Sequence, residues 1–301
     1  MSRYAILSDA HANLEALNAV YEDAESNNAT DFYYLGDAVV YGPNPIGCLD
    51  KLLQIIGENS WEEKAVMGNN DSAVWKAIKG TAERESMREF TDHKQNDAFG
   101  NISDQAKKRR NATLKSHEWT VQQLRDDPER SLYLSKMSLS PLNIDKKNDF
   151  LLVHASPCEC TGNEGNYLHE LSDAEEAFYY LKEGIRCCFF GHTHRPIIFK
   201  QESQKRLYDN CTRDFPSAGY ILKYDEGSSQ NRFLINPGSV GQPRNGETFA
   251  CYAILDTAQK QVEFYRVAYS MNNTIKALED IAKETGESWP NELAQRLKVG
   301  A

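Results

Sequence analysis

Residues 4–11 read Tyr4-Ala5-Ile6-Leu7-Ser8-Asp9-Ala10-His11, a short apolar run that ends in a carboxylate and an imidazole. Four apolar residues bounded by polar ones predict a buried strand over residues 4–7. The same pattern recurs at Phe32-Tyr33-Tyr34-Leu35, which ends at Gly36-Asp37, and at Lys64-Ala65-Val66-Met67, which ends at Gly68-Asn69-Asn70-Asp71. Helical spacing follows the first two runs, over about 14–24 and 46–56. Strands that alternate with helices predict an α/β sheet with crossover connections.

Two later runs end in histidine. Phe150-Leu151-Leu152-Val153 leads to His154, and 187–190 leads to Gly191-His192-Thr193-His194. In open α/β sheets ligands bind outside the carboxyl ends of the strands, so we expect these polar side chains to converge. Carboxylates, one amide and imidazoles together suit a pair of divalent ions such as Mn, Fe, Zn, Ni or Co, and not a thiolate zinc finger or a calcium site. The metal-competent side chains are Asp9, His11, Asp37, Asn69, His154, His192 and His194.

The pattern breaks after the third run. Residues 72–127 carry helical signals, and we expect a helical insertion (cap) over about 72–140 that lies across the site. The last third contains strand-like runs at 220–224, 232–235, 249–255 and 262–267, which predict a second, largely antiparallel sheet. Closing helices are expected over 272–285 and 290–297.

Length and charge narrow the function classes. The 301 residues suit one large α/β domain, 1–301, and the net charge of −10 argues against a stable nucleic-acid partner. The start of the chain has no signal-peptide pattern, and no apolar stretch approaches the about 20 residues of a membrane span, so we expect a cytoplasmic protein without a membrane partner. The basic run Lys107-Lys108-Arg109-Arg110 favours a solvated helix face, with an anion site in the cleft as the second interpretation.

Seven cysteines, without a repeated spacing, are expected to be free thiols. Cys187 and Cys188 lie in a predicted buried strand, where cysteine behaves as a small apolar residue. Cys158 and Cys160 follow His154, but the ligand set is complete without them.

In order and spacing, these motifs resemble those of the calcineurin-like metallophosphoesterases. That family has D-x-H, G-D, G-N-H-D or G-N-H-E, a lone histidine, and G-H-x-H, and the five segments quoted above match it over about residues 3–270. Residues 41–45 and 236–244 further resemble a bacterial branch of small phosphodiesterase-like proteins. The resemblance implies a four-layer α-β-β-α sandwich of two mixed sheets flanked by helices.

The resemblance also implies how the ligands divide. One ion would be held by Asp9, His11, Asp37 and His194, and the other by Asp37, Asn69, His154 and His192. Two metals about 3.5–4 Å apart activate a shared water and stabilise charge on the phosphate oxygens.

Two positions depart from the family pattern. Asn70 stands where the family has a histidine that protonates the leaving group or steadies the phosphate, and asparagine has no proton to give. Ala12 replaces a glycine, so we expect a turn without positive φ.

Other positions near the motifs have more than one interpretation. Asp71 would orient the neighbouring asparagines or cap a helix. Arg244 is a candidate phosphate contact or a surface ion-pair residue, and Asn13 a phosphate contact or a helix cap. We expect the remaining histidines, His93, His117 and His169, to lie on the surface, although His93 and His117 could reach back from the insertion.

Together these features predict a metal-dependent phosphodiesterase that acts on a small phosphate ester, with Asp37, Asn70, Asp71 and Arg244 as catalytic candidates. One alternative is a phosphomonoesterase acting on protein or nucleotide phosphate. The other is a catalytically weak, metal-stabilised interaction scaffold, which exposed aromatics at Tyr167, Phe178, Tyr179 and Tyr180 would support; core packing of a helix is the competing interpretation of those four.

Overall fold

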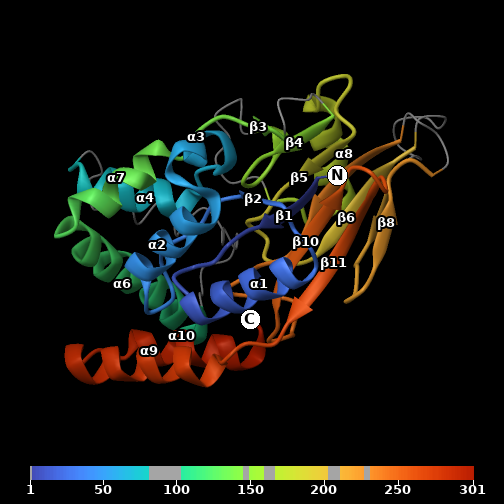
Figure 1. Ribbon diagram of the computed structural model, residues 1–301. Coiled ribbons are helices and arrows are strands. Elements are labelled where there is room, and N and C mark those ends of the chain that lie inside the picture. Colours follow the sequence, from blue (N-terminus) through green and yellow to red (C-terminus); the bar gives the residue numbers. More distant parts are fainter. Residues whose placement is uncertain (1, 81–102, 145–148, 159–166, 203–210, 227–230) are drawn as a thin grey trace.

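Two mixed β-sheets form the centre of the computed structural model, which describes residues 2–80, 103–144, 149–158, 167–202, 211–226 and 231–301 (Figure 1). In the first sheet the strand order is β2-β1-β10-β11-β8. Only the β1–β2 pair is parallel. Its strands are β1 (Arg3–Leu7), β2 (Asp31–Tyr34), β8 (Ile221–Lys223), β10 (Ala250–Asp256) and β11 (Gln261–Val267).

The second sheet has the order β3-β4-β5-β9-β6-β7, with a parallel centre formed by β4, β5 and β9. Its outer pairs are antiparallel. Its strands are β3 (Leu142–Asn143), β4 (Phe150–Leu152), β5 (Cys187–Phe189), β6 (Ile197–Gln201), β7 (Cys211–Asp214) and β9 (Arg232–Asn236).

The two sheets pack face to face. Ile6 and Phe264 of the first sheet lie in one buried apolar cluster with Phe189 and Ile235 of the second. Side chains alternate between the two faces of a strand. Ala5 and Leu7, which flank Ile6 in the chain, therefore point to the outer face of the first sheet.

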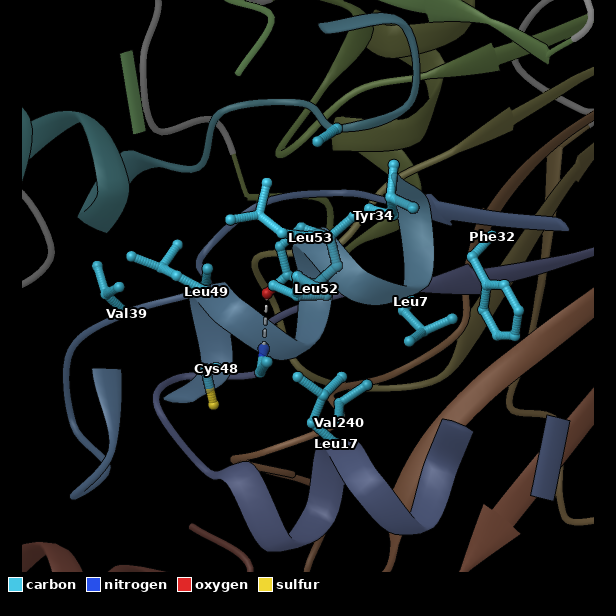
Figure 2. Packing of buried hydrophobic residues seen from close by; sticks show 14 of the residues in the cluster. Leu7, Leu17, Phe32, Tyr34, Val39, Cys48, Leu49, Leu52, Leu53 and Val240 are labelled. Atoms are coloured by element: carbon cyan, nitrogen blue, oxygen red, sulfur yellow. Dashed lines mark hydrogen bonds between the residues drawn. The ribbon is translucent and has the colours of Figure 1, made fainter. Parts of the chain in front are cut away.

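Helices cover both outer faces. Figure 2 shows leucines of α1 (Leu14–Ser26) and α2 (Pro45–Ile56) around Leu7 and Tyr34 of the first sheet. On the second sheet, Phe178 of α8 (Leu171–Tyr180) packs against Cys188 and Leu234. The expected four-layer sandwich of two mixed sheets flanked by helices is therefore confirmed.

The remaining helices gather at one side of the sandwich, where α9 and α10 lie below α6 in Figure 1. The helix α6 packs against α4 and α10, and the Ser116 hydroxyl on α6 accepts a hydrogen bond from the Tyr41 amide at 2.7 Å. These elements are η1 (Glu58–Ser60), α3 (Trp61–Lys64), α4 (Asn69–Ile78), α6 (Asp104–Arg125), α7 (Pro128–Lys136), α9 (Met271–Thr285) and α10 (Trp289–Val299).

Two expectations about strands are wrong. The strands of the last third do not form a sheet of their own: β9 enters the parallel centre of the second sheet, whereas β8, β10 and β11 complete the first. The run 64–67 is the end of α3 followed by two isolated bridges, Tyr34 to Ala65 and Val66 to Ser138. Both results depend on long-range pairing, which local residue patterns do not specify.

The expected helical insertion agrees with the structure where its residues are described. α6 and α7 lie in it, whereas 81–102 fall outside the described residues. Its extent as a separate cap over 72–140 stays a prediction. Among the helices that the structure describes, none is long and apolar enough to cross a membrane.

Candidate metal centre

Loops that follow β1, β2, β4 and β5 bring the expected ligands together. Two buried groups form: Asp9, His11, Asp37 and His194 in one, and Asp37, His154 and His192 in the other. Within each group the ligand atoms lie within 4.8 Å of one another, and Asp37 belongs to both. The convergence expected at the carboxyl ends of the strands is present.

Backbone carbonyls set the orientation of three imidazoles. The Nδ1 atom of His11 lies 3.1 Å from the Val39 oxygen, that of His154 2.7 Å from the Leu35 oxygen, and that of His194 2.6 Å from the Gln242 oxygen. A carbonyl only accepts, so each Nδ1 carries a proton and the Nε2 atom of each ring is directed toward the centre, where a neutral ring offers a lone pair.

The first group has the donor set of a cation site. His11 Nε2 and His194 Nε2 are 3.0 Å apart, and Asp9 Oδ1 lies 3.3 Å from His194 Nε2. Asp37 Oδ2 is 3.7 Å from His11 Nε2. Two inward lone pairs beside two carboxylates repel one another unless a positive charge lies between them. These residues therefore fit a divalent ion.

The second group fits a cation in the same way. His154 Nε2 lies 3.5 Å from Asp37 Oδ2. One end of the Asn69 carboxamide lies 2.7 Å from His192 Nδ1, 3.0 Å from His154 Nε2 and 3.2 Å from Asp37 Oδ2. The structure has the amide oxygen Oδ1 at this end of the side chain, where it would serve as a fourth ligand to a bound ion.

Burial and neighbouring charge perturb the titration of these groups. Burial, together with the negative charge of Asp37, raises the pKa of Asp9 to about 7. For Asp37 itself burial acts upward, but the neighbouring imidazoles, His154 above all, hold its pKa below the ordinary value. Burial lowers the pKa of His11 to about 3, so this ring is neutral and able to coordinate at physiological pH.

The backbone at the site is strained. Of the ten non-glycine residues with positive φ in the described part of the chain, eight lie in the ligand loops. Such conformations cost about 1–3 kcal/mol each and persist where the surrounding structure enforces them. The eight are Asp9, His11, Ala12, Asp37, Val40, Tyr41, His192 and His194.

Ala12 corrects an expectation. It adopts φ 54°, so the turn does use the left-handed region that glycine favours, and the prediction of an ordinary turn is wrong. Its amide donates to the Ala38 carbonyl at 2.8 Å, and this bond between the loops after β1 and β2 helps to hold it there.

Asp71 and Asn70 hold the Asp37 loop. The Asp71 carboxylate accepts hydrogen bonds from the amides of Asp37 at 2.7 Å, Ala38 at 2.9 Å, Val39 at 3.3 Å and Gly68 at 3.1 Å. The last bond caps α4, as one of the two interpretations of Asp71 expected. Asn70 binds both oxygens of Asp37, through its backbone amide at 2.8 Å and through its side-chain Nδ2.

The segment 236–244 supports the ligand loops through side-chain hydrogen bonds to the backbone carbonyls of those loops. Ser239 Oγ donates to the Asp9 carbonyl at 2.9 Å, and Asn236 Nδ2 donates to the Gly191 carbonyl at 2.6 Å. The resemblance drew attention to this segment, but not to the Gln242 carbonyl that orients His194.

A cavity of about 1140 Å³ opens onto the ligands. It is lined by Asp37, Asn69, Asn70, His192 and His194, and also by Arg244, one of the catalytic candidates. The Arg244 side chain donates to Gln242 Oε1 at 3.0 Å.

Residues of α6 reach the same cavity. Arg109 and Arg110 line it, which favours the second interpretation of the basic run for these two residues, whereas Lys107 and Lys108 do not line it. His117 also lines it and is only 4% exposed, so the expectation of a surface histidine is wrong there and the alternative, that His117 reaches back from the insertion, is confirmed. Its Nδ1 lies 2.9 Å from the Thr113 carbonyl, and burial lowers its pKa.

Asn13 and Tyr167 have clear positions near the ligand loops. Asn13 caps α1 and is buried, so the capping interpretation is confirmed. Tyr167 stacks on His192 with ring centroids 4.0 Å apart, and on its other neighbour His169 at 5.2 Å. His93 and Cys160 lie outside the described residues.

The aromatic side chains of α8 differ in exposure. Phe178 is core, as the packing interpretation expected, whereas Tyr179 and Tyr180 of α8 are exposed. Cys187 and Cys188 are buried in β5, as expected. The described cysteines are free, and Cys158 belongs to neither ligand group.

A strand-end cluster of this composition between two sheets defines a metallophosphoesterase-type site, and comparison with known proteins agrees. The family model of the calcineurin-like phosphoesterase superfamily domain matches residues 3–260. The chain belongs to the calcineurin-like phosphoesterase superfamily, and this membership implies hydrolase activity on phosphate esters.

Individual proteins are similar over their full length. The chain is 29% identical to protein MJ0912 of Methanocaldococcus jannaschii over 99% of this chain and 98% of that protein. It is 29% identical to the solved metallophosphoesterase from Sphaerobacter thermophilus, with a TM-score of 0.72 and coverage of 99% of this chain and 100% of that one. The hypothetical protein PH1004 from Pyrococcus horikoshii shares the fold, at 20% identity, a TM-score of 0.64 and coverage of 100% and 99%.

Proposed function

We propose that this protein hydrolyses phosphodiesters with a pair of divalent metal ions. The observation that carries the proposal is the pair of buried ligand groups that share Asp37. Asp9, His11, Asp37 and His194 would hold one ion, and Asp37, Asn69, His154 and His192 the other. When bound, two such ions lower the pKa of water and offset the charge that develops on phosphate oxygens.

The chain's own residues would prepare this site. Two hydrogen bonds would position Asp37: the Asn70 backbone amide donates to the Asp37 carboxylate, and the Asp71 carboxylate accepts from the Asp37 backbone amide. Arg244 lines the cavity and its backbone amide donates to the His194 carbonyl at 3.2 Å, so we propose that its guanidinium contacts a phosphate oxygen.

The choice of diesters rests on the missing proton donor. Asn70 cannot protonate a leaving group, and burial lowers the pKa of His117, so the neutral imidazole is a poor acid at pH 7. General acid catalysis contributes roughly 10²–10⁴-fold where it operates. A diester carries less charge than a monoester and, with a good leaving group, depends less on that contribution.

The test is hydrolysis of bis(p-nitrophenyl) phosphate by metal-stripped protein, with Mn, Ni, Co, Zn and Mg added back singly. We expect turnover that requires an ion, that exceeds turnover of p-nitrophenyl phosphate, and that Asp37→Ala abolishes. Faster hydrolysis of the monoester would favour the phosphomonoesterase.

One observation favours a second candidate, the metal-stabilised scaffold. Asn70 bonds to Asp37 and supplies no acid, which is compatible with a structural metal site. Bound ions that raise the melting temperature, with no turnover of either ester, would establish the scaffold and contradict the hydrolase.

A further inference from the structure

The cavity at the metal centre is strongly basic although the chain is acidic. Two carboxylate side chains, Asp37 and Glu247, line it where the structure describes its wall. Glu247 is already paired with Arg266, at 3.2 Å. Six arginines line the same cavity: Arg109, Arg110, Arg195, Arg244, Arg266 and Arg296.

Arg296 of α10 lies one aromatic ring away from a metal ligand. Its guanidinium carbon is 5.2 Å from the centroid of the Tyr41 ring, and the edge of that ring meets His11 with centroids 4.7 Å apart. Its Nε donates to the Ala301 backbone oxygen at 3.2 Å. Within the described ranges, no Asp or Glu side chain forms an ion pair with Arg296, Arg109 or Arg244.

The three arginines lie close enough to repel one another. Burial, together with the positive charges of Arg244 and Arg109, lowers the pKa of Arg296 to about 10. The charge of Arg244 also acts on His11 and His194, so Arg244 is near the metal centre as well as near Arg296. Its Nε atom is buried and has no hydrogen-bond partner among the described residues.

Such a cluster is arranged for an anion. Crowded guanidinium groups without carboxylates are unfavourable until a multivalent anion neutralises them, and planar guanidinium forks match phosphate oxygens in pairs. A cavity of about 1140 Å³ also exceeds the pockets of roughly 300–1000 Å³ that hold whole small molecules. A single phosphoryl group at the metal centre would leave Arg109 and Arg296 unused.

We propose that Arg109 and Arg296 form a second phosphate subsite, with Arg244 shared between it and the metal centre, so that the substrate is an organic molecule with at least two phosphate groups. The proposal rests on the proposed function for the first phosphate. The second phosphate either continues a polyphosphate chain or sits elsewhere on the same molecule. Nucleotides of each kind, compared in the experiment below, distinguish the two arrangements.

The test measures binding, so that it does not depend on turnover. Calorimetry on the metal-loaded protein compares thymidine 5′-monophosphate with thymidine 3′,5′-bisphosphate and with thymidine 5′-triphosphate. We expect one of the two larger probes to bind about tenfold or more tightly than the monophosphate, the gain of one charge-assisted contact. Tighter binding of the triphosphate would show that the second phosphate continues a polyphosphate chain. Tighter binding of the bisphosphate would show that it sits elsewhere on the molecule.

Matched variants assign the gain to the subsite. Arg109→Gln should remove most of this preference, whereas Lys108→Gln removes the same charge from the same helix outside the cavity and should keep it. Arg296→Lys keeps a charge but not the fork, and should reduce the preference in part if its melting temperature matches the wild type.

Equal affinity of all three probes would overturn the subsite, as would an equal loss in Lys108→Gln and Arg109→Gln. Failure of the proposed function is a separate result. A preference that depends on Arg109 in a protein that does not hydrolyse bis(p-nitrophenyl) phosphate would keep the subsite and remove the catalytic role.

Discussion

At the scale of single residues, the candidate site depends on which atom each side chain turns inward. His11, His154 and His194 each have Nδ1 beside a backbone carbonyl, so one protonation state is selected and Nε2 is left for a metal. Asn70 differs because its side chain is engaged with Asp37. We propose that it is a positioning residue, where the family pattern has a histidine that protonates the leaving group or steadies the phosphate.

We expect Asn70→His to change leaving-group dependence. An imidazole can protonate a poor leaving group such as an alkoxide, whereas nitrophenolate departs unprotonated, so kcat for alkyl nitrophenyl diesters should change little and kcat for dialkyl diesters should rise by up to about 10²-fold. Steady-state kinetics on both series at constant metal concentration provides the measurement. A uniform change in both series would show that the residue acts only through Asp37.

Ala12 offers a test of backbone strain. Ala12→Gly loses a buried methyl group but relieves a left-handed conformation, so we expect a change in the free energy of unfolding within about 0.5 kcal/mol of zero. Ala10→Gly, in the same loop and equally buried but without positive φ, should destabilise by about 1 kcal/mol. Urea titration of both variants gives the comparison, and an equal loss in both would mean that the loop is not strained at Ala12.

At the scale of elements, the ends of strands and helices are joined by short polar contacts. Asp71 is the N3 residue of α4, yet three of its four amide partners belong to the loop after β2. Gly68 is required beside it, because a Cβ there would come within 2.2 Å of the Asp37 amide nitrogen. The amino end of α4 and the Asp37 loop therefore behave as one unit.

Asp71→Asn should weaken both stability and metal binding. The amide group of asparagine brings donors toward backbone donors, and unsatisfied buried groups cost about 1–3 kcal/mol, so we expect that loss in the free energy of unfolding together with weaker binding of Mn. Denaturant unfolding and calorimetric titration with Mn measure the two effects.

Asp173→Asn provides the matched control for this variant. Asp173 occupies the same capping position in α8, where it accepts from the amides of His169 and Glu170, away from the cavity. It should lose stability without losing affinity for Mn. Unchanged Mn affinity in Asp71→Asn would contradict the positioning role.

At the scale of the whole molecule, charge is segregated. The chain carries a net charge of −10, whereas arginines from α6, α10, β11 and the loops after β5 and β9 meet in one cavity. Bound ions would be the largest local charges there and would add to this positive field. A chain of negative net charge can therefore contain a locally positive cavity.

Metal stabilisation should grow with pH. The folded, metal-free protein holds a proton on Asp9 up to about pH 7, whereas an unfolded aspartate loses it near its model value of 3.8. Asp9 therefore makes the metal-free fold less stable as pH rises through this window, and metal binding, which needs the carboxylate, strengthens over the same window. His11, with its pKa lowered to about 3, is neutral throughout most of it.

We expect the increase in melting temperature caused by Mn to be larger at about pH 7.5 than at about pH 5. Differential scanning calorimetry with and without Mn measures it, with Asp9→Asn as a variant that removes the titrating group. An increase that is the same at both pH values would mean that the Asp9 pKa in the metal-free fold is not raised.

The sequence by itself indicated the candidate ligand residues and the strands that precede most of them, because both are local features. The two-sheet sandwich followed from the resemblance to the family. An apolar run followed by aspartate or histidine is readable wherever it occurs, and the motifs in order indicate one family. The closing helices α9 and α10 were predictable for the same reason, since their apolar spacing is local.

Only the tertiary structure decided what depends on partners distant in the chain. The distribution of β8, β9, β10 and β11 between two sheets depends on long-range pairing. The positive φ of Ala12 follows from contacts with neighbouring loops, and the burial of His117 from the packing of α6 against α4 and α10. The meeting of Arg109, Arg244 and Arg296 required three separate elements to be in place, since charges far apart in sequence carry no local signal of their proximity.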